Sequence, residues 1–263
     1  MKSNIDLSIV IPSINPSVWL DLFSQLSKTI VRYNFELICV GPFFPTKELE
    51  SYHNFLFIKD YGCPSRCFQL GSTIANGKYL AFISDDCMIE QTFDDCINFM
   101  NSYAGPEDGM NLLYSEGPGY TGSQDKDPGY WRPYTHGALR LRHVRPDWNV
   151  ATCFLYRTDF FRHIGGLNCQ FEHVNMNSHD LAFRAQRKGT KIHQSPRKTH
   201  SADWHPWESD ESKKGPIQLS FEQNDMPLFK KIYQDTDEEP PIFISYDNWR
   251  NVPNVWPRRF ITK

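Results

Sequence analysis

The first half of the chain alternates short apolar runs with segments whose apolar residues recur at helical spacing. Four apolar runs predict strands, at 7–11, 35–40, 55–58 and 79–83. Two intervening segments predict helices, at 18–30 with Ser17 as N-cap and at 65–76, ended by Gly77. This alternation is typical of βα units that feed a mostly parallel sheet, so the fold class is predicted to be α/β.

The second half continues the pattern until about residue 195. Helices are predicted at 91–102, 158–163 and 180–188, the last ended by Gly189, and strands at 112–114 and 150–156. The connection from 115 to 148 is rich in Gly, Pro and aromatic residues, and a connection of that length is expected to carry function.

Length and charge limit the interpretation further. A chain of 263 residues with 40% hydrophobic content suits one α/β domain with a C-terminal appendage. We divide it into a domain at 1–200, made of parts 1–114 and 115–200, and an extension at 201–263 that packs on it. The 28 basic and 31 acidic residues give a net charge of −3, which disfavours a nucleic-acid binder.

Cysteine usage and hydropathy indicate a reducing, aqueous environment. The seven cysteines have no regular spacing and several stand inside apolar runs, so buried reduced thiols are expected. No apolar run approaches the ~18 residues of a membrane span, and the sequence predicts a cytoplasmic protein.

Two adjacent carboxylates, Asp85 and Asp86, follow the strand predicted at 79–83. Open α/β sheets bind ligands beyond the carboxyl ends of their strands, and paired carboxylates there suit a divalent cation that carries a diphosphate. The alternative is that the two residues cap the next helix.

The chain resembles family-2 glycosyltransferases of the GT-A type over about residues 5–200. Four segments carry the resemblance: Leu7-Ser-Ile-Val-Ile-Pro-Ser13, the run from Leu70 to Cys87, Gly165-Gly166, and Asp180-Leu-Ala-Phe-Arg184. The resemblance implies a GT-A, Rossmann-like three-layer domain with a mostly parallel central sheet. It also implies transfer of a sugar from a nucleotide-diphosphate sugar to a hydroxyl acceptor, with inversion and with metal assistance.

By resemblance, the nucleotide sugar is bound by residues at four places in the chain. They are Pro12, Ser13 and Asn15; Arg66 and Gln69; Ser84 and Asp85; and Gly165, Gly166 and Arg184. For Arg66 a plain surface position on a helix is an equal alternative. Gly41 stands where the family has an acidic residue for the base, so recognition of a uridine nucleotide is expected from the family alone.

The resemblance also implies a Mn²⁺ or Mg²⁺ site. The family's Asp-x-Asp motif reads Ser84-Asp85-Asp86 here, so Asp86 falls on the usual metal position and Asp85 on the variable one. His200 is the expected third ligand, with His205 as the alternative.

Asp180 is the expected general base, at the opening of its helix, with Glu172 and His179 behind it. The family's leading acidic pair reads Asn-Ser or Ser-His here, depending on register. The alternative for Asp180 is a carboxylate that is favoured by the helix dipole.

On the acceptor side, Tyr130, Trp131 and Trp148 are candidates to stack on a sugar, unless they pack the long connection onto the domain. The expected partners are a UDP-sugar and a hydroxyl on a glycan, a lipid-linked glycan or a protein; nothing selects the acceptor or the oligomeric state. Two rival functions stay open: a sugar-phosphate nucleotidyltransferase and a non-catalytic GT-A-like binding protein.

Overall fold

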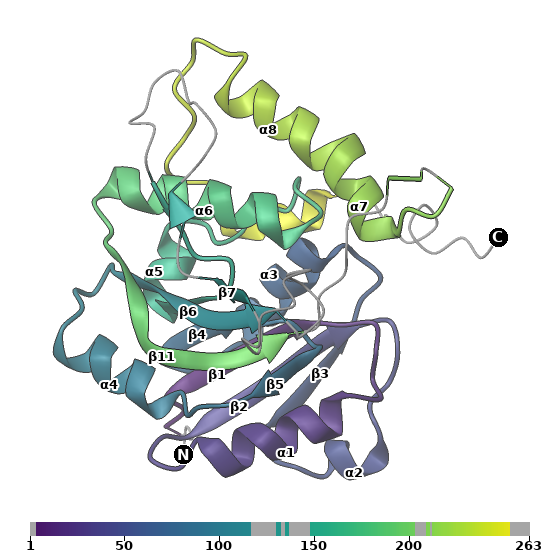
Figure 1. Ribbon diagram of the computed structural model, residues 1–263, viewed down its shortest axis with the longest axis vertical. Helices are drawn as coiled ribbons and strands as arrows, with labels where there is room; N and C mark the ends of the chain where they lie inside the picture. The colour runs from purple at the N-terminus through teal and green to yellow at the C-terminus, as the bar shows by residue number, and fades with distance from the viewer. Residues whose placement is uncertain are drawn as a thin grey trace.

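A mostly parallel sheet lies between two layers of helices in the computed structural model (Figure 1). The structure describes residues 4–116, 130–132, 135–136, 148–202, 209–210 and 212–252. The strands are β1 (Leu7–Pro12), β2 (Phe35–Gly41), β3 (Phe55–Lys59), β4 (Tyr79–Phe82), β5 (Cys87–Ile89), β6 (Gly109–Glu116), β7 (Tyr130–Arg132), β8 (Thr135–His136), β9 (Asn149–Val150), β10 (Phe154–Arg157) and β11 (Ile192–Ala202). The helices are α1 (Trp19–Thr29), α2 (Lys47–Glu50), α3 (Pro64–Ile74), α4 (Asp94–Ser102), α5 (Thr158–His163), α6 (Val174–Lys188), α7 (Pro216–Ser220) and α8 (Met226–Tyr233), with a π-helical turn η1 (Phe221–Asp225) and a 3₁₀ helix η2 (Tyr246–Asn251).

The main sheet has the strand order β3-β2-β1-β4-β10-β6-β11-β5, and β7 pairs with β6 at one end. Strands β1 to β4 are parallel, β10 is antiparallel to both of its neighbours, and β5 is antiparallel to β11. The three-layer α/β architecture predicted from the sequence is therefore confirmed. Because β1, β2, β3 and β4 run in one direction, their carboxyl ends meet along one edge, where open α/β sheets bind ligands.

Burial on both faces explains the apolar runs of the central strands. Every residue of β2 and β4 is buried, as expected for parallel strands covered by helices on both sides. Helices α1, α2 and α4 pack on one face, and α3, α5 and α6 pack on the other. Gly71 lets α3 approach the sheet, because a Cβ there would lie 2.5 Å from Cγ1 of Val10.

Several predicted boundaries are wrong. Helix α6 begins at Val174, six residues before the expected start at Asp180, since polar residues in its first turns hide the periodicity. Order continues beyond Ser195, where β11 pairs with β6 and β5. The predicted N-cap Ser17 instead donates to the side chain of Asn15, and α1 starts without a side-chain cap.

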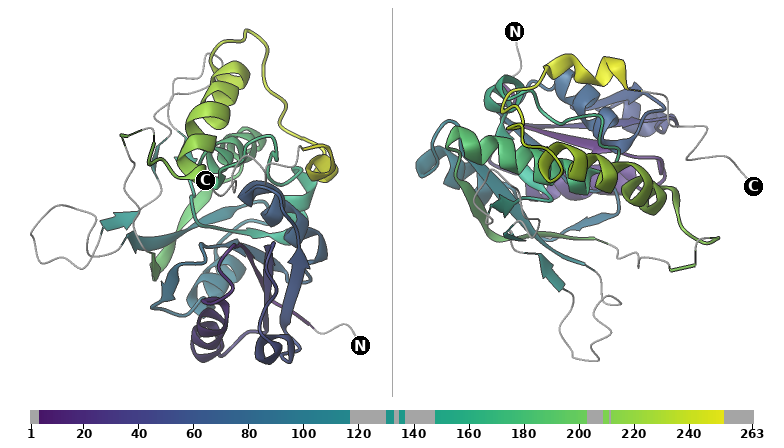
Figure 2. Two further views of the ribbon diagram at one scale, coloured as in Figure 1. Left: turned by 90° about the vertical axis from the view of Figure 1, so that its right-hand side faces the viewer. Right: turned by 90° about the horizontal axis from the view of Figure 1, so that it is seen from above.

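The C-terminal elements cover the α3–α6 side of the sheet. Helix α8 lies over α6, on the side away from the sheet (Figures 1 and 2), and its Phe229 and Tyr233 are buried in the same cluster as α6. The chain then returns to α3, where η2 packs against that helix (Figure 2). The extension is thus continuous with the core of the domain.

All seven cysteines are buried as thiols, as predicted. Burial raises the pKa of several of them, that of Cys96 to about 12. Among the described residues, no helix is both long enough and apolar enough to cross a membrane.

Candidate functional site

Ser13, directly after β1, connects three segments at the carboxyl edge of the sheet. Its hydroxyl donates to Oδ2 of Asp85 and accepts from Nε1 of Trp19 at 2.7 Å and from the backbone N–H of Asn15 at 3.1 Å. Its own N–H donates to the carbonyl of Val40 at 3.0 Å. The predicted donor-site residues Ser13, Asn15 and Asp85 are therefore close together.

Asp86 lies beside Asp85 at the exit of β4, and both carboxylates are half-buried. Ser84, which stands where the family has its first aspartate, donates its hydroxyl to Oδ1 of Asp86. Among the described residues, no group of three or more His, Cys, Asp or Glu side chains is placed to hold a metal ion. Magnesium is commonly bound by one or two carboxylates with substrate phosphates as the remaining ligands, so a donor set of two carboxylates fits a cation that arrives with a diphosphate.

The structure does not support His200 as the third metal ligand. Its side chain is fully buried in β11, where it stacks on Tyr114 with 5.2 Å between ring centroids and contacts Oγ1 of Thr199 through Nδ1 at 2.7 Å. Burial lowers the pKa of His200 to about 3, so the ring is neutral. The alternative ligand, His205, lies outside the described residues.

Steric crowding explains why a glycine, Gly41, stands where an acidic residue is expected after β2. A Cβ at this position would lie 1.8 Å from the carbonyl oxygen of Ser13, so only glycine allows the exits of β1 and β2 to approach. Beside it, Phe44 is 62% exposed, and the ammonium of Lys59 lies 4.4 Å from the centre of its ring. The exposed ring of Tyr61 lies near the same ammonium. Sequence reasoning missed this aromatic group, although Pro42-Phe43-Phe44 at a strand exit was a visible signal.

Arg66, at the start of α3, is held by Asp60 and by the C-terminal segment. Its Nε and Nη2 donate to the Asp60 carboxylate at 3.0 and 2.9 Å, and its Nη1 donates to the carbonyl of Trp249. The ion pair with Asp60 raises the pKa of Arg66. Asp60 follows β3 as Asp85 follows β4, so the reasoning applied to Asp85 would have found it too.

Gln69 is not available to a ligand, contrary to the prediction. Its side chain is fully buried and donates to the carbonyls of Gly165 and Tyr246 at 3.2 and 2.9 Å, while its oxygen accepts from the N–H of Leu167 at 2.9 Å.

Gly165 and Gly166 adopt positive φ angles of 94° and 66°. A Cβ on Gly166 would lie 2.3 Å from Oε1 of Gln69, and one on Gly165 would lie 2.1 Å from the carbonyl oxygen of Ile244. The two glycines are therefore required by packing against α3 and the C-terminal segment.

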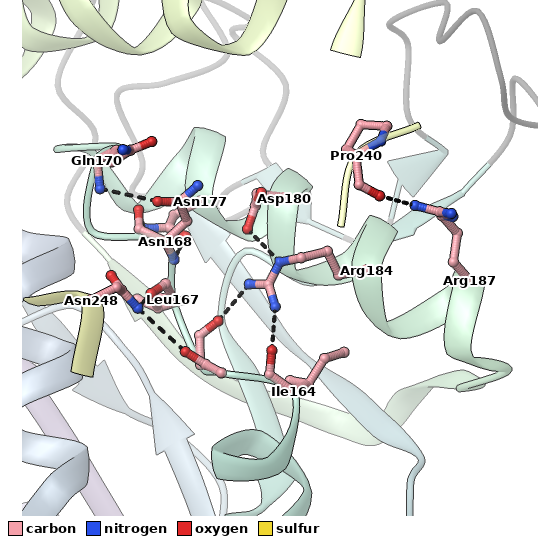
Figure 3. Close-up of polar contacts among 12 residues, drawn as sticks. Ile164, Leu167, Asn168, Gln170, Asn177, Asp180, Arg184, Arg187, Pro240 and Asn248 are labelled. Atoms are coloured by element: carbon pink, nitrogen blue, oxygen red, sulfur yellow. Dashed lines mark hydrogen bonds and ion pairs between the residues drawn. The ribbon is translucent and has the colours of Figure 1, made fainter. Parts of the chain in front are cut away.

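Asp180 lies in the second turn of α6 and is 2% exposed, so the prediction of an accessible carboxylate at the helix opening is wrong. Its Oδ2 accepts from Nε of Arg184 at 2.8 Å, and its Oδ1 accepts from the hydroxyl of Tyr233. Arg184 continues the network by donating to the carbonyls of Ile164, at 2.8 Å, and Gly166 (Figure 3). Both charged side chains are therefore bonded to partners within the protein. Arg184 is 1% exposed, so it is not positioned to bind a phosphate, contrary to the prediction.

His179 is also a poor base. Its ring lies between Trp148 and Phe229, at centroid distances of 5.9 and 6.1 Å, and burial lowers its pKa to about 4. Asn177, one of the residues that stand in place of the family's acidic pair, is buried. Its side-chain amide accepts from the backbone N–H of Asn168 and donates to the carbonyl of the same residue (Figure 3). The next residue, Ser178, donates its hydroxyl to the carbonyl of Val174.

Glu172 lies in the chain between the turn formed by Gly165 and Gly166, called the glycine turn below, and α6. Its side chain is buried, its carbonyl accepts from the N–H of Ser65, and its N–H donates to Asp225 at 2.8 Å. Asp225 also accepts from the N–H of His173 at 2.7 Å, and burial raises the pKa of Asp225 to about 6. The π-helical turn thus positions the segment that carries Glu172.

The predicted acceptor-side aromatics are only partly described. Trp148 is 3% exposed and packs against Phe183, so it belongs to the core and is not an open stacking platform. Tyr130 and Trp131 lie on β7, which pairs with β6.

Comparison with known proteins places the fold among the GT-A structures. The S. aureus TarS structure matches with a TM-score of 0.54 and 17% identity over 89% of this chain and 41% of that chain. TarS 1–349 in complex with UDP matches with a TM-score of 0.51 and 16% identity over 86% of this chain and 73% of that chain. GalNAc-T7 with UDP, GalNAc and Mn²⁺ matches with a TM-score of 0.57 and 13% identity over 84% of this chain and 48% of that chain. No family model and no curated protein sequence matches. The chain has a GT-A fold and spans less than half of the TarS and GalNAc-T7 chains in the first and third of these structures.

Proposed function

We propose that this GT-A domain transfers a sugar from a nucleoside-diphosphate donor, with a UDP-sugar as the first candidate, to a hydroxyl group of a glycan, a lipid-linked glycan or a protein. The observation that carries the proposal is the pair of carboxylates Asp85 and Asp86 at the exit of β4, joined through Ser13 to the exit of β1. UDP in the TarS and GalNAc-T7 structures supports the choice of donor.

Mn²⁺ or Mg²⁺ bound by Asp85 and Asp86 would neutralise charge on the departing diphosphate. Ser13 and Trp19 orient Asp85 for this role, and Ser84 orients Asp86. The exposed ring of Phe44 and the ammonium of Lys59 are candidates to contact the base, in place of the acidic residue that Gly41 replaces.

An inverting transfer needs one base beside the acceptor hydroxyl. Asp180 is bonded to both Arg184 and Tyr233, and His179 is packed among aromatic rings, so Glu172 is the remaining candidate for this role. Its side chain is buried in this structure, so the role requires that the carboxylate become accessible to the acceptor. Its backbone N–H donates to Asp225, which fixes the segment that carries this residue.

The test is a calorimetric titration of the protein with UDP, GDP, CDP and dTDP, with and without Mn²⁺. We expect Mn²⁺-dependent binding of UDP that is lost in Asp86→Ala, since the variant removes one of two carboxylate ligands. The matched control, Glu48→Ala, removes an exposed carboxylate on α2 and should bind as the wild type does.

If no nucleotide binds with or without Mn²⁺, the proposal fails. The non-catalytic alternative then stands. The family's acidic pair reads Asn177-Ser178 or Ser178-His179 here, depending on register, and its loss favours that alternative.

A further inference from the structure

A cavity of about 420 Å³ lies between α6, the end of α8 and the C-terminal segment that carries η2. Its volume is within the range of small-molecule sites in proteins. The cavity lies in the helical layer, and neither Ser13 nor Asp85 nor Asp86 lines it. We propose that this cavity binds a neutral sugar residue, at a site separate from the nucleotide edge of the sheet.

The charges that line the cavity are already neutralised. Asp180 and Arg184 contribute to its wall, and Asp180 accepts from both Arg184 and Tyr233. The remaining guanidinium nitrogens of Arg184 donate to two backbone carbonyls (Figure 3). An anionic or cationic ligand would therefore find no unsatisfied counter-charge in this pair, whereas a neutral ligand needs none.

Amide side chains supply the polar contacts. Gln170 and Asn251 are exposed at the cavity, and their side-chain amides make no hydrogen bond within the described part of the chain. The Nδ2 of Asn168 is likewise without a bond there, while its Oδ1 accepts from the N–H of Gln170 at 3.2 Å. Each amide offers both a donor and an acceptor, which matches a sugar hydroxyl because a hydroxyl is also both.

Aliphatic side chains complete the wall. Ile232 from α8, with Ile244 and Val252 on either side of η2, provide apolar surface in the same lining. A pyranose presents C–H groups on its faces and hydroxyls at its edge, so a wall of mixed aliphatic and amide character suits it. The site needs neither nucleotide nor cation, and it therefore goes beyond the proposed transfer reaction.

The test is binding of three neutral disaccharides, lactose, cellobiose and N,N′-diacetylchitobiose, to the full chain without nucleotide or metal, by saturation-transfer NMR and calorimetry at millimolar concentrations. We expect at least one to bind, and the double variant Gln170→Ala/Asn251→Ala to weaken that binding by about tenfold or more, because two hydrogen-bonding side chains are lost. Both side chains are exposed, so the variant should keep the wild-type melting temperature.

Gln223→Ala is the matched control, since it removes an exposed amide from η1 outside the cavity. It should leave disaccharide binding unchanged, and inorganic phosphate should not compete. The proposal is overturned if no disaccharide binds, if the double variant binds as tightly as the wild type, or if phosphate displaces the sugar. UDP binding by the double variant is measured separately, so failure of this site and failure of the nucleotide site are distinguishable.

Discussion

At the scale of single residues, burial decides the chemistry of the two predicted histidines. The sequence predicted His179 as a candidate base behind Asp180 and His200 as a metal ligand. The structure buries His200 completely and packs His179 among aromatic rings, and burial lowers the pKa of both. Because the folded state holds each imidazole neutral in an apolar environment, protonation of the ring in acid favours the unfolded state.

This predicts an acid sensitivity that His179→Phe reduces. Above pH 6.5 the ring is neutral in both folded and unfolded states, so it makes no pH-dependent contribution. As the pH falls below 6.5, the unfolded state binds a proton that the folded state takes up only near its pKa of about 4, and stability falls across that window. At pH 5 the cost is about 2 kcal/mol.

Urea unfolding of the wild type and His179→Phe at pH 7.5 and pH 5 measures the effect. The variant should lose less stability on acidification by about that amount, while His200 keeps its own contribution in both proteins. Equal losses in the two proteins would contradict the assignment.

At the scale of elements, the Asp180–Arg184 pair fixes α6 to the glycine turn. Arg184 is 1% exposed and reaches the carbonyls of Ile164 and Gly166, and Tyr233 of α8 reaches Asp180 from the other side. Three elements thus meet at one buried ion pair, of which Figure 3 shows the contacts of Arg184 with Asp180 and Ile164.

Asp180→Ala should therefore lower the free energy of unfolding by about 3–5 kcal/mol, because it leaves the Arg184 charge buried without its carboxylate. Asp159→Ala, which removes a 74% exposed carboxylate from α5, is the control and should have little effect. Chemical denaturation measures both.

The double variant Asp180→Leu/Arg184→Met should recover much of that stability, since apolar replacement of a whole buried pair is often neutral. A stably folded Asp180→Ala protein that has lost only transfer activity would restore Asp180 as the base.

At the scale of the whole molecule, the C-terminal elements complete the helical layer on the α3 side of the sheet. Phe229 is fully buried, and its ring contacts His179 of α6 and Phe171 of the segment that precedes α6. The same segment then holds Arg66 through Trp249 and Gln69 through Tyr246. We therefore treat the described part of the extension, 212–252, as part of one folding unit with the domain.

Phe229→Ala should cost about 3–5 kcal/mol of stability, in a single cooperative transition shared with the sheet. Phe243→Ala, at a side chain 45% exposed, is the control and should cost about 1 kcal/mol. Thermal and urea unfolding followed by both fluorescence and circular dichroism measure the two variants. A separate low-stability transition for the C-terminal segment would contradict a single folding unit.

The sequence by itself determined the features that depend on neighbours in the chain. The apolar runs of β1, β2 and β4, alternating with helical segments, predicted a mostly parallel sheet, and the structure buries these strands between helices. Asp85 and Asp86 stand just beyond the end of β4 in the chain, so their place at the carboxyl edge could be predicted without any tertiary contact.

Only the tertiary structure decided which polar residues face a ligand and which face the interior. Asp180 looks catalytic in the sequence, but a tyrosine 53 positions later along the chain buries it. Gln69 is occupied by carbonyls from 165 and 246, and Gly41 is required by the carbonyl of Ser13. Hydrophobic periodicity reports which face of an element is buried, whereas the partner of a buried polar group is set by contacts between distant segments, which no local pattern encodes.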